Sequence, residues 1–372
     1  MPLYREAISD LTVHLPRRDL RAMILAVRTL YRLGRLPAYR KAVLPRLPEV
    51  ARFDPGHDAV MMGYDFHLTE DGPRLIEVNT NAGGALLSLL AQHADEVSAL
   101  AGLNNKFKAA FLGPFAEEIR AFSGGRRTRP QRIAILDENP SQQFLYREMQ
   151  VFADLFRAWG VDADVVDPCR LQAGADGVWL DNRPVDMIYN RHCDFYLEED
   201  AMTGIRAAYL AGSVCLSPNP FAYGLLGDKR RMVLWSDPQA LGALGVAEED
   251  AALLLRLVPK SRLLATEKAD VLWQERRALV FKPVDRFGSR GVLVGEKISR
   301  KRFEQLDPAT TLAQQLVPPS LTHGADDDPP MKTDLRLFVY RDRILGIGAR
   351  LYRGQVTNLR TEKGGFARVR VV

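Results

Sequence analysis

Apolar and polar residues alternate between Gly63 and Gly84, in the segment GYDFHLTEDGPRLIEVNTNAGG. This alternation is typical of half-buried β-strands, and the letters EDG between its two halves are a turn signal. The pattern predicts a hairpin whose apolar face is made of Phe66, Leu68, Ile76 and Val78. The opposite face would carry Asp65, His67, Glu77 and Asn79.

The length of the turn decides which polar residues of this hairpin face each other. If residues 70–72 form a three-residue loop that ends in a left-handed glycine, Asp65 falls opposite Glu77. Two carboxylates directly across a strand pair repel each other, whereas Mg²⁺ prefers oxygen ligands and often binds carboxylates together with nucleotide phosphates. The hairpin therefore predicts a Mg²⁺ site made of Asp65, Glu77 and Asn79. A solvated polar face on an edge hairpin is the alternative interpretation.

Outside the hairpin, the first 125 residues repeat their apolar positions at helical spacing. Helices are expected within residues 1–50, from Ala85 onward and over about residues 100–122. The glycine pair and the basic cluster in residues 123–129 (SGGRRTR) indicate a linker.

From Arg132 onward the pattern changes to strands that alternate with helices. Strands are predicted at RIAILDE, VDADVVD and VDMIYNR, and helices over residues 141–159 and 198–211. This order is typical of a parallel, Rossmann-like α/β domain. No G-x-G-x-x-G motif follows the first of these strands, so dinucleotide binding is not supported.

The last third of the chain predicts a second mixed unit. A helical region is expected over about residues 227–257. The strands that follow are predicted at LVFKPV, GVLVGE, TLAQQLV and DLRLFVYRDRILGIGARLY, with a turn at Gly364-Gly365. The fold class is thus α/β and α+β.

Composition narrows the functional classes. The chain has 372 residues, 47% of them hydrophobic and 26% charged, and no apolar run long enough to cross a bilayer. The N-terminal residues lack the apolar core of a signal peptide, and the three cysteines have no metal-type spacing. We therefore expect a cytoplasmic protein without a membrane partner. The net charge of +5 comes from scattered arginines, which favours anionic small ligands over nucleic acid.

A lysine inside an apolar strand is the second chemical signal. Lys282 lies within ALVFKPV, where an unpaired ammonium is costly to bury and needs an anionic partner. The next loop contains Gly288, Ser289 and Gly291, whose backbone N–H groups could approach phosphate oxygens closely. It is not a Walker loop, because no G-K-[ST] precedes a helix. A plain turn is the alternative.

Taken together, these motifs resemble the ATP-grasp superfamily of ligases. That family has a strand lysine before a flexible glycine loop, an adenine hinge that TLAQQLV resembles, and a D-x-R strand followed by a further arginine. Here the last two are Asp334-Leu335-Arg336 and Arg350. Its metal ligands are an acidic residue and an E-x-N pair, as in Asp65 and Glu77-Val78-Asn79.

The order of the motifs departs from the usual one. The metal hairpin ordinarily follows the D-x-R strands, but here it comes near the N-terminus. The chain is therefore similar to circularly permuted, glutathione-synthetase-like and glutathionylspermidine-synthase-like members. On this resemblance residues 1–125 hold N-terminal helices and the permuted metal hairpin, and 126–225 a Rossmann-like domain. Residues 226–320 would form the lid subdomain with the glycine loop, and 321–372 the rest of the C-terminal subdomain.

The resemblance implies an ADP-forming ligase that joins a small carboxylic acid to an amine through an acyl phosphate, with ATP and Mg²⁺ as cofactors. The implied nucleotide contacts are Lys229, Lys282, Gly288, Ser289, Gly291, Gln314, Gln315, Leu316 and Val317. The implied catalytic residues are Arg336, Arg350 and Asn358, the metal ligands Asp65, Glu77 and Asn79, and the substrate contacts Asn81 and Arg191. A small-molecule kinase and a non-catalytic nucleotide-binding partner protein are the alternatives. The substrates, the role of residues 1–50 and homo-oligomerisation stay open.

Overall fold

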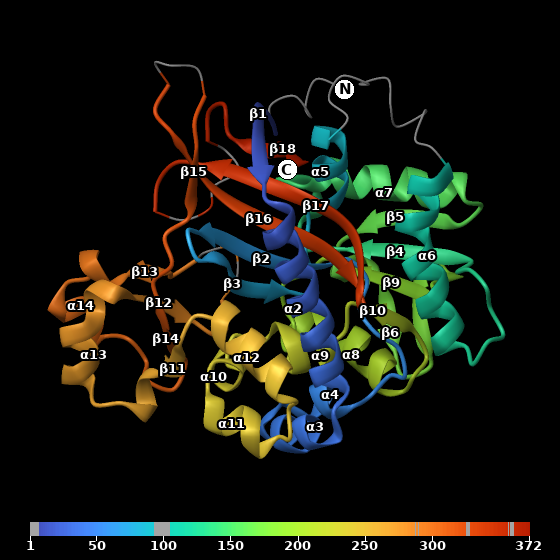
Figure 1. The fold of residues 1–372 in the computed structure, drawn as a ribbon. Helices are drawn as coiled ribbons and strands as arrows, with labels where there is room; N and C mark the ends of the chain where they lie inside the picture. Colours follow the sequence, from blue (N-terminus) through green and yellow to red (C-terminus); the bar gives the residue numbers. More distant parts are fainter. Residues whose placement is uncertain are drawn as a thin grey trace.

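The computed structural model describes residues 7–92, 105–286, 288, 290–324, 328–355, 357 and 361–372. Its largest sheet joins strands from the two ends of the chain (Figure 1). In spatial order these are β1 (Ile8–Leu15), β18 (Gly365–Val371), β17 (Arg343–Tyr352), β16 (Met331–Tyr340), β2 (Met62–Thr69) and β3 (Gly72–Asn79). A short strand, β15 (Ser320–Thr322), also pairs with β16.

Strand β1 corrects the expectation that the first 50 residues are helical. It pairs in parallel with β18, and backbone hydrogen bonds join Arg17 N to Val372 O and Val372 N to Leu15 O. The expected helices begin after it, as α2 (Arg17–Arg35), α3 (Pro37–Val43) and α4 (Glu49–Arg52). The helical repeat is clear in α2, where Met23, Val27 and Leu30 are fully buried.

The two faces of the large sheet pack on different parts of the chain. Leu335, Leu337 and Val339 of β16 belong to the core that contains α2. The alternate residues Phe338 and Tyr340 belong to the core that contains α6 and the α/β unit. Two helices lie on this second side, α5 (Ala85–Gln92) against β17 and β18 and α6 (Asn105–Phe122) against the α/β unit.

The α/β unit has the predicted parallel sheet, in the order β10 (Cys215–Ser217), β9 (Met187–Asn190), β4 (Arg132–Leu136) and β5 (Asp162–Val166). Its helices are α7 (Tyr146–Ala158) and α8 (Thr203–Leu210). Helix α7 begins later than expected, because residues 140–142 form a separate 3₁₀ turn. A small antiparallel sheet of β6 (Gln172–Gly174), β7 (Gly177–Leu180) and β8 (Arg183–Pro184) adjoins it.

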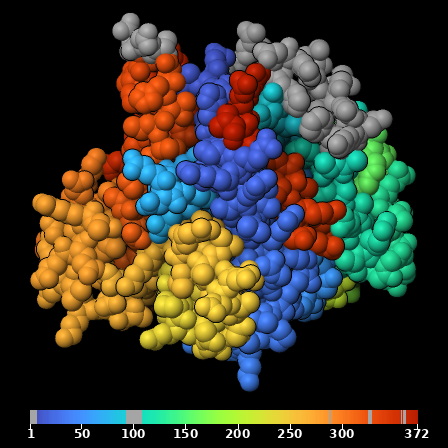
Figure 2. All heavy atoms as spheres, in the orientation of Figure 1, coloured from blue at the N-terminus to red at the C-terminus, as the bar shows by residue number. Residues whose placement is uncertain are grey.

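The lysine strand belongs to a third sheet, β11 (Ser261–Leu263), β14 (Thr311–Gln315), β12 (Leu279–Pro283) and β13 (Leu293–Val294). Helices α13 (Ala269–Glu275) and α14 (Arg300–Glu304) lie with it in a lobe drawn in orange in Figure 2, beside β2 and β3. The helical region expected over about 227–257 is confirmed and consists of α10 (Arg231–Trp235), α11 (Pro238–Ala243) and α12 (Glu248–Leu257). The break at Asp237 is a cap, since its carboxylate accepts from the N–H groups of Gln239 and Ala240.

Before this region, residues 220–227 form the short helix α9 (Pro220–Ala222) and a π-helical turn (Tyr223–Gly227). In the described part of the chain, none of the helices combines the length and apolar character needed to cross a membrane.

Candidate functional site

The hairpin of β2 and β3 lies directly beside β16 in the large sheet. Arg336 of β16 faces Asp65 of β2, and Asp65 faces Glu77 of β3. The expected pairing of the two carboxylates is confirmed, but the turn between the strands is shorter than predicted. Thr69 pairs with Gly72, and a bulge beside Asp65 restores the register.

Asp65 is the centre of a buried ion-pair network. Arg336 donates to both of its oxygens, Nε to Oδ1 and Nη2 to Oδ2, each at 2.6 Å. Arg350 of β17 donates from Nη2 to Oδ2 of Asp65 at 2.8 Å, and from Nε to Oδ1 of Asp334 at 2.6 Å. Burial opposes ionisation of Asp65, but the two guanidinium groups outweigh it and hold its pKa well below the usual range.

The amide of Asn79 joins the two carboxylates of the hairpin. Its Nδ2 lies 3.2 Å from Oδ2 of Asp65 and 3.2 Å from Oε1 of Glu77. Two carboxylates and an amide within reach of one another form a donor set that suits Mg²⁺. Across the described residues no group of three or more His, Cys, Asp or Glu side chains could hold a metal. The fit to Mg²⁺ therefore rests on this mixed set.

Two lysines approach the hairpin from the lobe and from the segment before α10. Lys282 is buried on β12, and its Nζ donates to Oε1 of Gln314 at 2.7 Å and to the carbonyl of Ile76 at 3.3 Å. Burial lowers the pKa of Lys282 to about 8, although Glu77 opposes this. The Nζ of Lys229 donates to the carbonyl of Arg286 at 2.6 Å, at the start of the glycine loop.

These groups line one cavity, with about 900 Å³ of empty space, between the hairpin, the lobe and the strands β16 and β17. The predicted residues on its wall are Asp65, Glu77, Lys229, Lys282, Gly288, Gln314, Gln315, Leu316, Val317 and Arg350. Of the other predicted residues that the structure describes, Asn79 and Arg336 contact Asp65 from outside this wall, and Gly291 lies off it. Ser289 and Asn358 lie outside the described residues.

The cavity wall also contains residues that the sequence did not single out for the site, among them His67 and Thr357. Nδ1 of His67 donates to the carbonyl oxygen of Val317 at 2.7 Å, which ties the hairpin of β2 and β3 to the expected adenine hinge. Burial lowers the pKa of His67, so the ring is neutral at pH 7. The alternation of the strand places His67 on the same face as Asp65. Its partner Val317 lies 250 positions further along the chain, so no local sequence pattern indicates this contact.

Comparison with solved structures finds similar folds. No family model matches the sequence, and no curated protein matches it. A glutathione synthetase-like effector from Globodera pallida aligns over 98% of this chain and 90% of its own, with a TM-score of 0.59 and 13% identity. A protein described as a candidate gamma-glutamylcysteine synthetase from Methylobacillus flagellatus aligns over 95% and 87%, with a TM-score of 0.51 and 12% identity. The fold is similar to that of glutathione synthetase-like proteins.

The two expected substrate contacts lie where the segment after the hairpin meets the α/β unit. Asn81 donates from Nδ2 to the carbonyl of His192 at 2.7 Å. Arg191 is buried, and its Nη1 lies 3.3 Å from Oε2 of Glu148, which also accepts from the N–H of Gly84. Neither Asn81 nor Arg191 is among the described residues that line the cavity.

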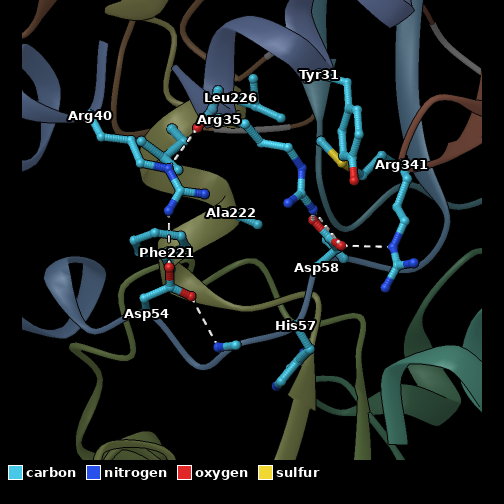
Figure 3. Close-up of a pocket in the computed structure, with 15 residues that line it drawn as sticks. Tyr31, Arg35, Arg40, Asp54, His57, Asp58, Phe221, Ala222, Leu226 and Arg341 are labelled. Carbon is cyan, nitrogen blue, oxygen red and sulfur yellow. Dashed lines mark hydrogen bonds and ion pairs between the residues drawn. The ribbon is translucent and has the colours of Figure 1, made fainter. Parts of the chain in front are cut away.

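A second cavity, with about 760 Å³ of empty space, lies at the end of α2 (Figure 3). Figure 3 shows Arg35 and Arg341 pointing toward Asp58, at 2.8 and 2.7 Å, and Arg40 toward Asp54, at 3.1 Å. The described residues on its wall include none of the predicted site residues. Because its arginines are paired with these aspartates, we assign it no role in the candidate site.

His57, on the wall of this second cavity, belongs to a buried polar cluster around Glu118 of α6. Glu118 accepts hydrogen bonds from His57 Nδ1 (2.8 Å), Ser217 Oγ (2.9 Å) and Tyr340 OH (2.8 Å). These partners come from the loop before β2, from β10 and from the end of β16. Burial opposes both charges, but the partners raise the pKa of His57 and lower that of Glu118. The cluster joins the large sheet to the α/β unit.

Proposed function

We propose that this protein is an ATP-dependent ligase that joins a small carboxylic acid to an amine and forms ADP. One observation carries the proposal. The carboxylates of the early hairpin and the lysine and arginine of the late strands, Asp65, Glu77, Lys282 and Arg350, line a single cavity. The names of the two structural neighbours, a glutathione synthetase-like effector and a candidate gamma-glutamylcysteine synthetase, support the same class of reaction.

In this proposal the nucleotide lies in the cavity between the hairpin and the lobe. Lys229 and Lys282 would bind the α- and β-phosphates, and the backbone of the glycine loop (Gly288, Ser289, Gly291) would cover them. The adenine edge would face Gln314, Gln315, Leu316 and Val317. Asp65, Glu77 and Asn79 would hold Mg²⁺, which supplies neutralisation of the phosphate oxygens when it is bound.

The resemblance to ATP-grasp ligases implies the following reaction, and the charges around the cavity fit it. The carboxylate of the acid attacks the γ-phosphorus of ATP, and the bond to the β–γ bridging oxygen breaks, which gives an acyl phosphate and ADP. The amine then attacks the acyl carbon, loses a proton and expels phosphate. Arg350, with Asn358, would stabilise the negative charge that gathers on the transferred group, a task suited to a rigid guanidinium group, and Arg336 would act beside them through Asp65. Asn81 and Arg191 stay predicted substrate contacts.

The position of the hairpin also supports the proposed circular permutation of an ATP-grasp fold. Strands β2 and β3 precede β16 in the chain, yet β2 pairs directly with β16. A hairpin that follows the D-x-R strands in other members would reach the same place in the sheet from the opposite end of the chain. Permutation is tolerated when the original termini lie close together at the surface.

The test is an ADP-release screen of the purified protein with Mg-ATP against panels of amino acids, short peptides and polyamines. A ligase gives ADP together with an amide, whereas a kinase gives a stable phosphoester. Glu77→Gln should abolish turnover and weaken Mg-ATP binding. Glu70→Gln, in the turn of the same hairpin, is the matched control and should leave both unchanged. If no acid stimulates turnover and Glu77→Gln binds Mg-ATP as the wild type does, the proposal is refuted.

A further inference from the structure

The two arginines that contact Asp65 use their guanidinium groups differently. Besides its two bonds to Asp65, Arg336 donates from Nη1 to the carbonyl of Gly83 at 3.2 Å. All three of its nitrogens are therefore bonded to the protein. Among the residues that the structure describes, Arg336 is not on the wall of the nucleotide cavity, whereas Arg350 is.

Arg350 keeps one edge of its guanidinium group for the cavity. Its hydrogen bonds to described residues leave from Nε, toward Asp334, and from Nη2, toward Asp65. The side chain is about 11% exposed, and Asp334 and Thr357 line the cavity beside it. A fork that is anchored at two of its nitrogens retains little rotational freedom, so the remaining nitrogen has a defined direction.

Asp334 supplies the anchor on one side of this fork. It lies directly across from Arg350 in the register of β16 and β17, and its side chain is about 3% exposed. Its Oδ1 accepts from Arg350 at 2.6 Å, and its Oδ2 accepts from the hydroxyl of Thr357 at 2.7 Å. Both oxygens are thus engaged, and the orientation of the carboxylate is set from two sides.

We propose that Asp334 is a positioning residue, which aims Arg350 at the terminal phosphate of a nucleoside triphosphate, while Arg336 holds Asp65. This inference rests on the proposed function and divides the work of the two arginines. Arg350 alone would then distinguish a triphosphate from a diphosphate. A network that merely balances buried charge would not make this distinction, because loss of Asp334 would weaken all nucleotides equally.

The experiment compares the dissociation constants of Mg-ATP and Mg-ADP by isothermal titration calorimetry. Asp334→Asn should weaken Mg-ATP roughly tenfold, the value of one charge-assisted hydrogen bond, and leave Mg-ADP unchanged. Asp58→Asn is the matched control, because it removes a carboxylate from Arg341 in the turn that joins the same two strands. It should keep the wild-type ratio of the two constants.

Two further variants keep the test decisive if Asp334→Asn folds poorly. Thr357→Val retains both charges and removes the hydroxyl that holds Asp334, so a smaller loss of Mg-ATP affinity is expected, again without a change for Mg-ADP. Arg336→Lys should instead raise the Mg²⁺ concentration needed for binding and keep the ratio.

If the ratio of the Mg-ADP and Mg-ATP dissociation constants stays at the wild-type value in Asp334→Asn and Thr357→Val, whether or not both affinities fall, the positioning role alone is overturned. A wild-type protein that does not bind Mg-ATP would overturn the proposed function, and this inference with it.

Discussion

Lys282 offers a test that measures the electrostatics of the cavity before any substrate is known. Its ammonium is buried on β12, where burial lowers its pKa from the ordinary value of 10.5 to about 8. The folded protein therefore keeps a charged ammonium at a position where burial disfavours the charge relative to the unfolded chain. We expect Lys282→Met to remove that cost and, at the same time, the proposed phosphate contact.

The magnitude follows from the pKa. Each pKa unit corresponds to about 1.4 kcal/mol, so the lowering from 10.5 to about 8 destabilises the folded protein by about 3 kcal/mol at pH 7. Lys282→Met also leaves Oε1 of Gln314 without its donor, which costs about 1–3 kcal/mol. The cost of the lost hydrogen bond is the same at every pH, whereas the cost of burying the ammonium depends on pH.

The sign of the pH dependence is set by which state binds the proton. Between pH 8 and 10.5 the unfolded chain keeps the proton on Lys282 and the folded chain releases it, so wild-type stability rises with pH over this window. The free energy of unfolding of Lys282→Met, relative to wild type, should therefore fall by about 3 kcal/mol between pH 7 and pH 10.5.

Urea denaturation of both proteins at these pH values measures this difference. Lys297→Met, an exposed lysine of the same lobe, is the control and should show no such trend. A difference between Lys282→Met and wild type that stays constant with pH would refute the reasoning. Calorimetry adds a second measurement, because Mg-ATP binding at pH 9 should take up about one proton in the wild type and none in Lys282→Met.

Three other results are expected. Glu118→Ala should lower the free energy of unfolding by about 3–5 kcal/mol in urea denaturation, because it breaks a buried charge pair, while its half-exposed neighbour Glu117→Ala should cost under about 1 kcal/mol. His67→Phe should weaken Mg-ATP about fivefold in calorimetry through loss of the bond to Val317, and an equal affinity would remove that role for the histidine. Chelation of Mg²⁺ by EDTA should abolish nucleotide binding, which a fluorescent nucleotide analogue can follow, and unchanged binding would contradict the proposed metal site.

The sequence predicted the elements whose periodicity is local. The hairpin and the β4 and β12 strands appear where alternation or short apolar runs placed them. Strand β1 was missed because the basic helical pattern of α2 dominated the region, although Leu11, Val13 and Leu15 alternate in the sequence. The helical region expected over 227–257 is present, and its division into separate helices was not predicted, although Pro238 begins a new helix after its capping aspartate.

Site geometry was harder to foresee, because it depends on contacts between distant parts of the chain. The motif spacing pointed to Asp65 and Arg336 separately, but their direct pairing follows from the register of β2 on β16. The different surroundings of Arg336 and Arg350 also depend on contacts between distant segments. So does the orientation of Asp334, whose carboxylate accepts from the hydroxyl of Thr357. No periodicity within a strand contains this information.

The pairing of Asp65 with Arg336 also has a consequence for biosynthesis. The two residues are 271 positions apart, which a ribosome covers on the order of tens of seconds. Meanwhile the α/β unit, whose strands all lie between residues 132 and 217, can already assemble from its own segments. The hairpin has to wait for β16, so the proposed ligands, ATP and Mg²⁺, would stabilise only a nascent chain that has grown almost to its last strands.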